Sequence, residues 1–159
     1  MKDLSVISTN HGFAHYGLMP TNELVFVKSY RKYCEDDICG NYNKHPMCPP
    51  MCGTFEELKK NVQNFKNVLV LQSIWHAEDF TDQEFIKKCK ATHNKNTKSL
   101  INELNFDGDT GIIISAGPGQ NTSCVSAYCI DVAEAAKFLN MNYYFQDNNF
   151  CLFSFFIFD

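Results

Sequence analysis

The chain has 159 residues, of which 45% are apolar, so it is long enough to build one sizeable hydrophobic core as a single domain. Its net charge of −4 excludes the broad positive surface that nucleic-acid-binding proteins use. The N-terminal segment MKDLSVISTNHG has no apolar run long enough for a signal peptide, and no other stretch is apolar enough to span a bilayer. We therefore expect a cytoplasmic protein without nucleic-acid or membrane partners, in a compartment where thiols stay reduced.

The first half of the chain predicts two strands and a helix around a cysteine-rich loop. Residues 24–27, LVFV, form a short apolar run that predicts a strand leading into this loop. Thr54 and Glu57 form a capping box, and apolar residues then recur at helical spacing, which predicts a helix over about 55–65. Residues 68–71, VLVL, are continuously apolar, as expected of a strand covered on both faces of its sheet.

A long helix is predicted next. Thr81 and Glu84 form a second capping box, and the apolar stripe that follows runs to Leu104 across a polar middle. Cys89 and His93 lie one helical turn apart on this stripe, which is the spacing of a metal-binding pair. Because the same positions continue the apolar stripe, core packing is the favoured interpretation for both.

The remaining sequence predicts a turn, a strand, a helix and a two-stranded aromatic hairpin, at residues 107–109, 111–114, 131–140, and 142–146 with 150–158. This order of elements predicts one α/β domain over residues 1–159, with three layers, a mixed sheet, a cysteine-rich metal loop and a C-terminal β-hairpin. The strands at 68–71 and 112–114 are expected to be adjacent and central, because an amphipathic helix separates them as in a right-handed β–α–β unit.

Four of the eight cysteines lie close together in the stretch YCEDDICGNYNKHPMCPPMCG. They are Cys34, Cys39, Cys48 and Cys52, with the spacing C-x4-C-x8-C-x3-C. Thiolates bind metals strongly, and structural disulfides are rare in the cytoplasm, so this cluster predicts one metal centre with all four cysteines as ligands. Cys52 precedes the helix cap Thr54 by two residues. The unpaired N–H groups there stabilise a thiolate.

Two kinds of metal centre fit this spacing. Zinc sites pair cysteines across about two to four residues, but about 12–20 residues usually separate the two pairs. Here the middle spacer has only eight residues. A 4Fe-4S cluster tolerates uneven spacers, and its loops often contain a Cys-Pro step such as Cys48-Pro49. The spacing therefore favours an iron–sulfur cluster, with zinc as the alternative and a reduced structural cysteine cluster as a third interpretation. His45 is a further, weaker candidate ligand.

The cysteine block DICGNYNKHPMCPPMCGTFEE resembles the hallmark of the DUF2284 family, predicted metal-binding proteins of bacteria and archaea. Three later blocks resemble the rest of the family pattern in order: VLVLQ at 68–72, ISAGP at 114–118 and SAYCIDV at 126–132. The resemblance implies metal binding but no settled reaction. Family members usually carry a second cysteine-rich insert after the Ala-Gly-Pro strand end, which this sequence lacks, and more often have glycine where Cys129 stands. Cys124 and Cys129 are therefore either remnants of a second site or, preferably, small apolar packing residues.

These observations favour an iron–sulfur protein that carries or senses electrons, or assists a redox enzyme, with a redox protein as its partner. The second hypothesis is a zinc-stabilised binding module. The third is a metal-dependent enzyme acting on a small molecule, which needs an open coordination position on the metal. No catalytic residue is predicted, because no nucleophile–base set or H-E-x-x-H motif can be argued from the chain.

Overall fold

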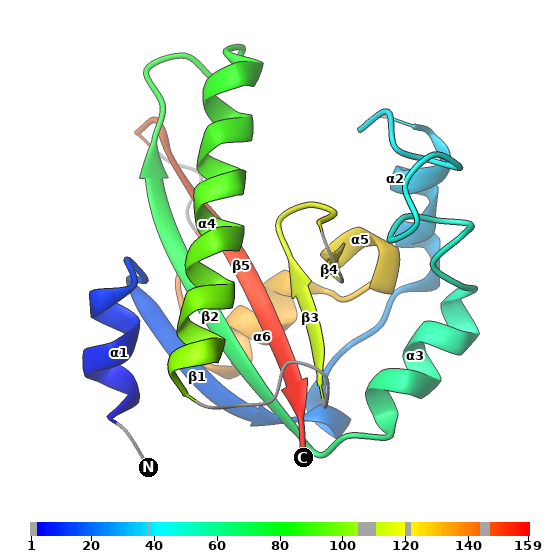
Figure 1. The fold of residues 1–159 in the computed structure, drawn as a ribbon, viewed down its shortest axis with the longest axis horizontal. Helices are drawn as coiled ribbons and strands as arrows, with labels where there is room; N and C mark the ends of the chain where they lie inside the picture. The colour runs from blue at the N-terminus through cyan, green and yellow to red at the C-terminus, as the bar shows by residue number, and fades with distance from the viewer. Residues whose placement is uncertain (1–2, 38, 105–110, 120–121, 144–146) are drawn as a thin grey trace.

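A five-stranded mixed sheet lies at the centre of the fold in the computed structural model, which describes residues 3–37, 39–104, 111–119, 122–143 and 147–159 (Figure 1). The strand order is β1-β2-β5-β3-β4. Neighbouring strands are antiparallel except for β3 and β4, which are parallel. The strands are β1 (His15–Pro20), β2 (Asn67–His76), β3 (Ile112–Ser115), β4 (Thr122–Cys124) and β5 (Asn149–Phe158). The predicted α/β class with a mixed sheet is confirmed.

Helices cover both faces of this sheet. They are α1 (Leu4–Asn10), α2 (Arg31–Glu35), α3 (Phe55–Gln63), α4 (Gln83–Glu103), α5 (Val125–Tyr128) and α6 (Val132–Phe138), with 3-10 turns η1 (Thr21–Glu23) and η2 (Lys28–Tyr30). Buried residues of α1 and α4 pack with one face of β2 and β5, and those of α3, α5 and α6 pack with the other. No helix within the described part of the chain is both long enough and apolar enough to cross a membrane.

The alternation of side chains along β2 and β5 explains the two-sided core. On β2, Val68 and Val70 belong to the cluster with α3, α5 and α6, whereas Leu69 and Leu71 belong to the cluster with α1 and α4. On β5, Phe155 likewise lies in the first of these clusters and its neighbour Phe156 in the second. Successive residues of a strand point to opposite faces, so a continuously apolar run is buried on both. This confirms the interpretation of residues 68–71.

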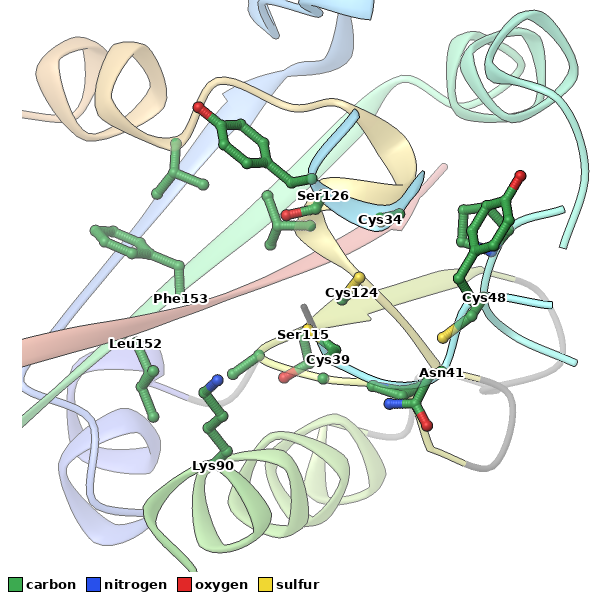
Figure 2. A pocket seen from close by; sticks show the side chains of 18 of the residues that line it. Cys34, Cys39, Asn41, Cys48, Lys90, Ser115, Cys124, Ser126, Leu152 and Phe153 are labelled. Carbon is green, nitrogen blue, oxygen red and sulfur yellow. The ribbon is translucent and has the colours of Figure 1, made fainter. Parts of the chain in front are cut away.

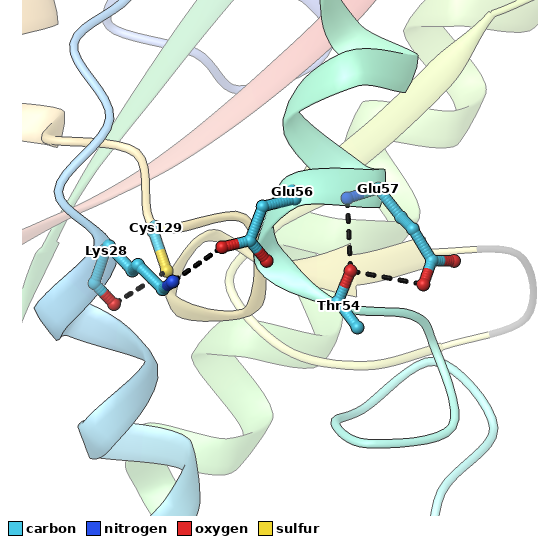
Figure 3. A network of polar contacts seen from close by, with 5 residues as sticks. All are labelled: Lys28, Thr54, Glu56, Glu57 and Cys129. Carbon is cyan, nitrogen blue, oxygen red and sulfur yellow. Dashed lines mark hydrogen bonds and ion pairs between the residues drawn. The ribbon is translucent and has the colours of Figure 1, made fainter.

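Two helix starts form as the sequence predicts. The Thr54 hydroxyl accepts a hydrogen bond from the Glu57 backbone N–H at 3.2 Å and contacts the Glu57 carboxylate at 3.1 Å (Figure 3). The Asp131 carboxylate accepts from the Glu134 backbone N–H at 3.2 Å and starts α6. Both caps depend on residues only three positions apart, which is why the local sequence is enough to predict them.

The start of α4 differs from the prediction by one residue. Its cap is Asp82, whose carboxylate accepts from the Phe85 backbone N–H at 3.1 Å. Thr81 lies one residue before this cap and is held by Asp79, which accepts hydrogen bonds from both its backbone N–H (2.8 Å) and its hydroxyl (2.6 Å). The helix then continues unbroken through its polar middle to Glu103.

The predicted adjacency of the strands at 68–71 and 112–114 is wrong. Both strands are interior and they run parallel to each other, but β5 lies between them and pairs antiparallel with each. Ten β5 residues pair with β2, so the C-terminal strand takes the central position that the local pattern assigned to a direct β2–β3 contact. The β–α–β connection through α4 therefore crosses over one strand.

Residues 24–27 do not form a strand of the sheet. Phe26 makes one isolated bridge with Ile130. The neighbouring backbone groups pair with the connection between α5 and α6, since Val27 N–H donates to the Cys129 carbonyl and Val25 C=O accepts from Asp131 N–H, both at 2.8 Å. The segment is thus an extended strap across α5 rather than part of the sheet.

Three further comparisons with the sequence predictions concern the first strand, the C-terminal hairpin and the turn after α4. Strand β1 was not predicted, because HYGLMP contains glycine and proline and is largely exposed at the sheet edge. The second strand of the expected hairpin is β5, whereas residues 144–146 of its first strand lie outside the described residues, and residues 142–143 are not in a strand. The expected turn at 107–109 also lies outside the described residues.

Candidate metal centre

The cysteine loop, residues 34–52, runs from α2 to the start of α3 and lies beside β4 and α5 (Figure 1). Its backbone folds on itself through hydrogen bonds from Asn43 N–H to the Pro49 carbonyl (2.8 Å) and from Cys52 N–H to the Cys48 carbonyl (3.1 Å). The Ser123 hydroxyl donates to the Met47 carbonyl at 2.8 Å and ties the loop to β4. The loop is therefore anchored to the sheet near its third cysteine.

A cavity of about 380 Å³ opens between this loop, α5 and the end of β3 (Figure 2). Three of the predicted ligands, Cys34, Cys39 and Cys48, line it. The opposite wall is formed by residues from β5 and α4, including Leu152, Phe153 and Lys90. The structure therefore brings three of the four predicted cysteines to one cavity.

Cys52 takes a different environment. It does not line the cavity, and its Sγ lies 3.9 Å from Arg31 Nη2 and 3.9 Å from the Gly53 carbonyl oxygen. Arg31 also donates to the Gly53 carbonyl at 2.7 Å and to the Ala127 carbonyl at 3.1 Å. The guanidinium thus links α2 to α5 and to the residues just before α3, and Cys52 lies beside it.

Sequence reasoning missed Cys124 as a member of this group. Cys124 is the last residue of β4, lines the same cavity, and hydrogen-bonds with the thiol of Cys34. Figure 2 shows its sulfur between the labelled cysteines of the loop. Only its position after the Ile-Ser-Ala-Gly-Pro block hinted at a site, because ninety residues separate it from Cys34 along the chain.

The thiols of the cavity differ in their tendency to ionise. The pKa of Cys124 is lowered to about 6, mainly because its sulfur accepts a hydrogen bond from the Cys34 thiol. Burial opposes this shift, and the backbone N–H groups of Ala127 and Ser126 add to it. The same contact with Cys124, together with burial, raises the pKa of Cys34 well above its usual range. Burial raises the pKa of Cys48 to about 11. Thiols must lose their protons to bind a metal, so the cation must displace the protons that remain on these sulfurs.

The cysteines line the wall of the cavity and do not converge on a single point. Among residues 3–37, 39–104, 111–119, 122–143 and 147–159, no three His, Cys, Asp or Glu side chains come close enough to hold a single ion. The donor set around the cavity is nevertheless made of thiols, which suit zinc and iron–sulfur clusters. The residues thus fit a sulfur-ligated centre chemically.

The other candidate ligands have local structural roles. His93 is fully buried and both of its ring nitrogens contact serine hydroxyls, so it forms no metal pair with the buried Cys89. His45 Nδ1 accepts a hydrogen bond from Met47 N–H at 3.0 Å and stabilises a turn of the loop. Cys129 is buried and has a φ of 57°, and its Sγ lies 3.6 Å from the Lys28 carbonyl oxygen (Figure 3). That φ lies in the left-handed region, which glycine adopts more readily than cysteine.

The Arg31→Lys substitution is expected to loosen the cavity wall. Lysine keeps the charge but cannot reach the Ala127 and Gly53 carbonyls in the forked geometry of a guanidinium. We expect the free energy of unfolding to fall by about 1–3 kcal/mol, as for loss of hydrogen bonds from a charged group. Chemical denaturation measures this directly. Lys28→Ala, which removes an exposed ion pair with Glu56 (Figure 3), should cost less than about 1 kcal/mol. Equal effects of the two substitutions would contradict the role of Arg31.

Comparison with known proteins agrees with the thiol-rich site. Residues 17–119 match the family described as "Predicted metal-binding protein (DUF2284)". The matched part begins within β1, contains the whole cysteine loop, β2, α4 and β3, and ends before Cys124. No curated protein and no solved structure matches the chain.

Proposed function

The chain belongs to the DUF2284 family of predicted metal-binding proteins, and from this premise we propose that its cysteine loop binds a 4Fe-4S cluster and that the protein transfers electrons. The observation that carries the proposal is the common cavity of Cys34, Cys39 and Cys48. Its volume of about 380 Å³ exceeds the space that one ion needs, and its sulfur donors line the wall at separated positions. A polynuclear cluster spreads its ligands in this way, whereas one zinc ion needs four sulfurs within roughly 4 Å of each other.

The protein surroundings of the cavity favour electron transfer over substrate chemistry. A 4Fe-4S cluster bound by four thiolates supplies a one-electron redox couple and has no vacant coordination position. Glu35, Asp36 and Asp37 are exposed beside Cys34 and add negative charge near the site. Negative charge disfavours the reduced, more negative state, so these residues should lower the reduction potential. Cys39 is exposed, which places the site close to the surface where a redox protein partner can dock.

The first test is the content and redox behaviour of anaerobically purified protein. We expect iron and acid-labile sulfide in equal amounts, a brown colour, and a broad visible absorbance that dithionite bleaches. The reduced protein should give a paramagnetic resonance signal, and ascorbate should be too weak to produce it because the potential is low. Cys34→Ser, Cys39→Ser and Cys48→Ser should each lose iron, while Cys89→Ser, which changes a buried thiol outside the cavity, should keep it.

Two outcomes would overturn this proposal. Colourless protein that holds one equivalent of zinc and no sulfide would replace the redox function with a zinc-stabilised binding module. Full iron content in all three loop variants would show that the cysteine loop is not the site.

A further inference from the structure

Cys124 holds a position that suits a metal ligand better than that of Cys52. Its thiol shares the cavity with Cys34, Cys39 and Cys48, and it contacts Cys34 directly. Cys52, by contrast, does not line the cavity and lies beside Arg31. Cys151 also lines the cavity, but it does so from β5 on the wall opposite the loop, whereas Cys124 contacts Cys34. Cys124 is therefore better placed than Cys52 or Cys151 to complete the set of three.

The backbone around Cys124 fixes this position. β4 pairs in parallel with β3, with Cys124 opposite Ser115, and the preceding Ser123 is bonded to Met47 in the cysteine loop. The backbone N–H groups of Ser126 and Ala127 donate to the Cys124 sulfur. Ligand sulfurs in iron–sulfur proteins are commonly held by hydrogen bonds of this kind, which tune the potential of the cluster.

We infer that Cys124 is the fourth ligand of the metal centre, together with Cys34, Cys39 and Cys48, and that Cys52 supports the centre from outside through Arg31. This inference rests on the proposed function, because it assigns a ligand to the same site. With this set of ligands, three cysteines come from the loop and one from β4. The bound metal would then join the loop to the sheet. Metal binding should then stabilise the contact of the loop with β4 and α5 as well as the loop itself.

The test compares matched serine variants of the full chain purified anaerobically. Iron and sulfide are measured per chain, followed by the rate of iron loss to a chelator. Cys124→Ser should lose the cluster as fully as Cys34→Ser does. Cys52→Ser should retain it, with an increase in the rate of loss of at most about 10–100-fold, the range for residues that only support a ligand. Cys89→Ser, which changes a buried cysteine of α4 that does not line the cavity, should match the wild type.

Alkylation of the wild-type protein provides a readout that does not depend on how a variant folds. Iodoacetamide labelling followed by mass spectrometry is done before and after the chelator removes the metal. We expect metal removal to increase labelling of Cys34, Cys39, Cys48 and Cys124 several-fold, and to leave that of Cys52 unchanged.

The outcomes separate this inference from the function on which it rests. If Cys34→Ser loses iron but Cys124→Ser keeps it, and Cys52 is the residue protected from alkylation, the fourth ligand is Cys52 and the inference is wrong. A disulfide between Cys34 and Cys124 in the holoprotein would also overturn it. If no variant binds iron differently from the wild type, the proposed function itself fails.

Discussion

Acidification from pH 6.5 to pH 4 is expected to reduce the free energy of unfolding by up to about 3 kcal/mol through one side chain, His93. Burial lowers the pKa of His93 to about 4, whereas an unfolded histidine titrates near 6.5. Between these values the unfolded chain binds a proton that the folded protein excludes, so stability falls as the pH falls through this window. Well above pH 6.5, from about pH 7.5, histidine is neutral in both states and contributes almost no slope.

The hydrogen bonds around His93 explain why the neutral ring is retained. Trp75 Nε1 donates to Ser73 Oγ at 2.6 Å, which leaves the Ser73 hydroxyl free to donate to His93 Nδ1, also at 2.6 Å. His93 Nε2 then carries the proton and donates to Ser154 Oγ at 2.7 Å, and Ser154 in turn contacts Thr97 and Ser115. One neutral tautomer therefore satisfies the contacts of the ring with Ser73 and Ser154, and a second ring proton would face the Ser73 hydroxyl hydrogen.

His93→Gln is the matched variant for this prediction. Its overall stability should be lower, because glutamine cannot reproduce both ring contacts, but its stability should change less between pH 6.5 and pH 4. Denaturant unfolding at a series of pH values gives the two slopes, and their difference isolates the histidine. Parallel pH profiles of the two proteins would show that His93 does not titrate with the shifted pKa.

The sequence predicts those features of the fold that depend on neighbours within one turn or one strand. The caps at Thr54 and Asp131 involve residues three apart, and the two-sided burial of 68–71 follows from its composition alone. The position of β5 does not follow in this way, because ten pairings with β2 decide it and these link residues about eighty positions apart. A hydrophobic pattern states that a strand is buried but not which strand lies beside it.

The candidate site likewise has one part that the local sequence predicts and one part that depends on distant contacts. The density of cysteines in the loop indicates a thiol-rich site, and the structure places Cys34, Cys39 and Cys48 on one cavity. The membership of Cys124 depends on the pairing of β4 with β3 and on a loop contact to Ser123. Spacing along the chain favours Cys52, because it lies in the same loop. In the structure its thiol lies beside Arg31 and not on the cavity, and no local sequence pattern predicts this contact.

Phe155→Ala should be the most destabilising single substitution considered for this protein. Phe155 is 0% exposed at the middle of β5, where it pairs with Val70 on one side and Ile114 on the other. Removing a fully buried ring loses the transfer free energy of the side chain and leaves a cavity, which together cost about 3–5 kcal/mol. For a chain of this length, such a loss lowers the melting temperature by roughly 6–20 °C.

Phe138→Ala is the control for this prediction, because it makes the same deletion at the end of α6, where the ring is 48% exposed. Its cost should stay below about 1 kcal/mol, since exposed substitutions away from special features have small effects. Thermal and denaturant unfolding of the two variants in the same metal state give the comparison. β5 also contributes Leu152 and Phe153 to the wall of the cysteine cavity, so Phe155→Ala should weaken metal retention as well, through loss of the strand that supports this wall. If the two phenylalanine variants unfold at the same temperature, β5 does not occupy the centre of the sheet.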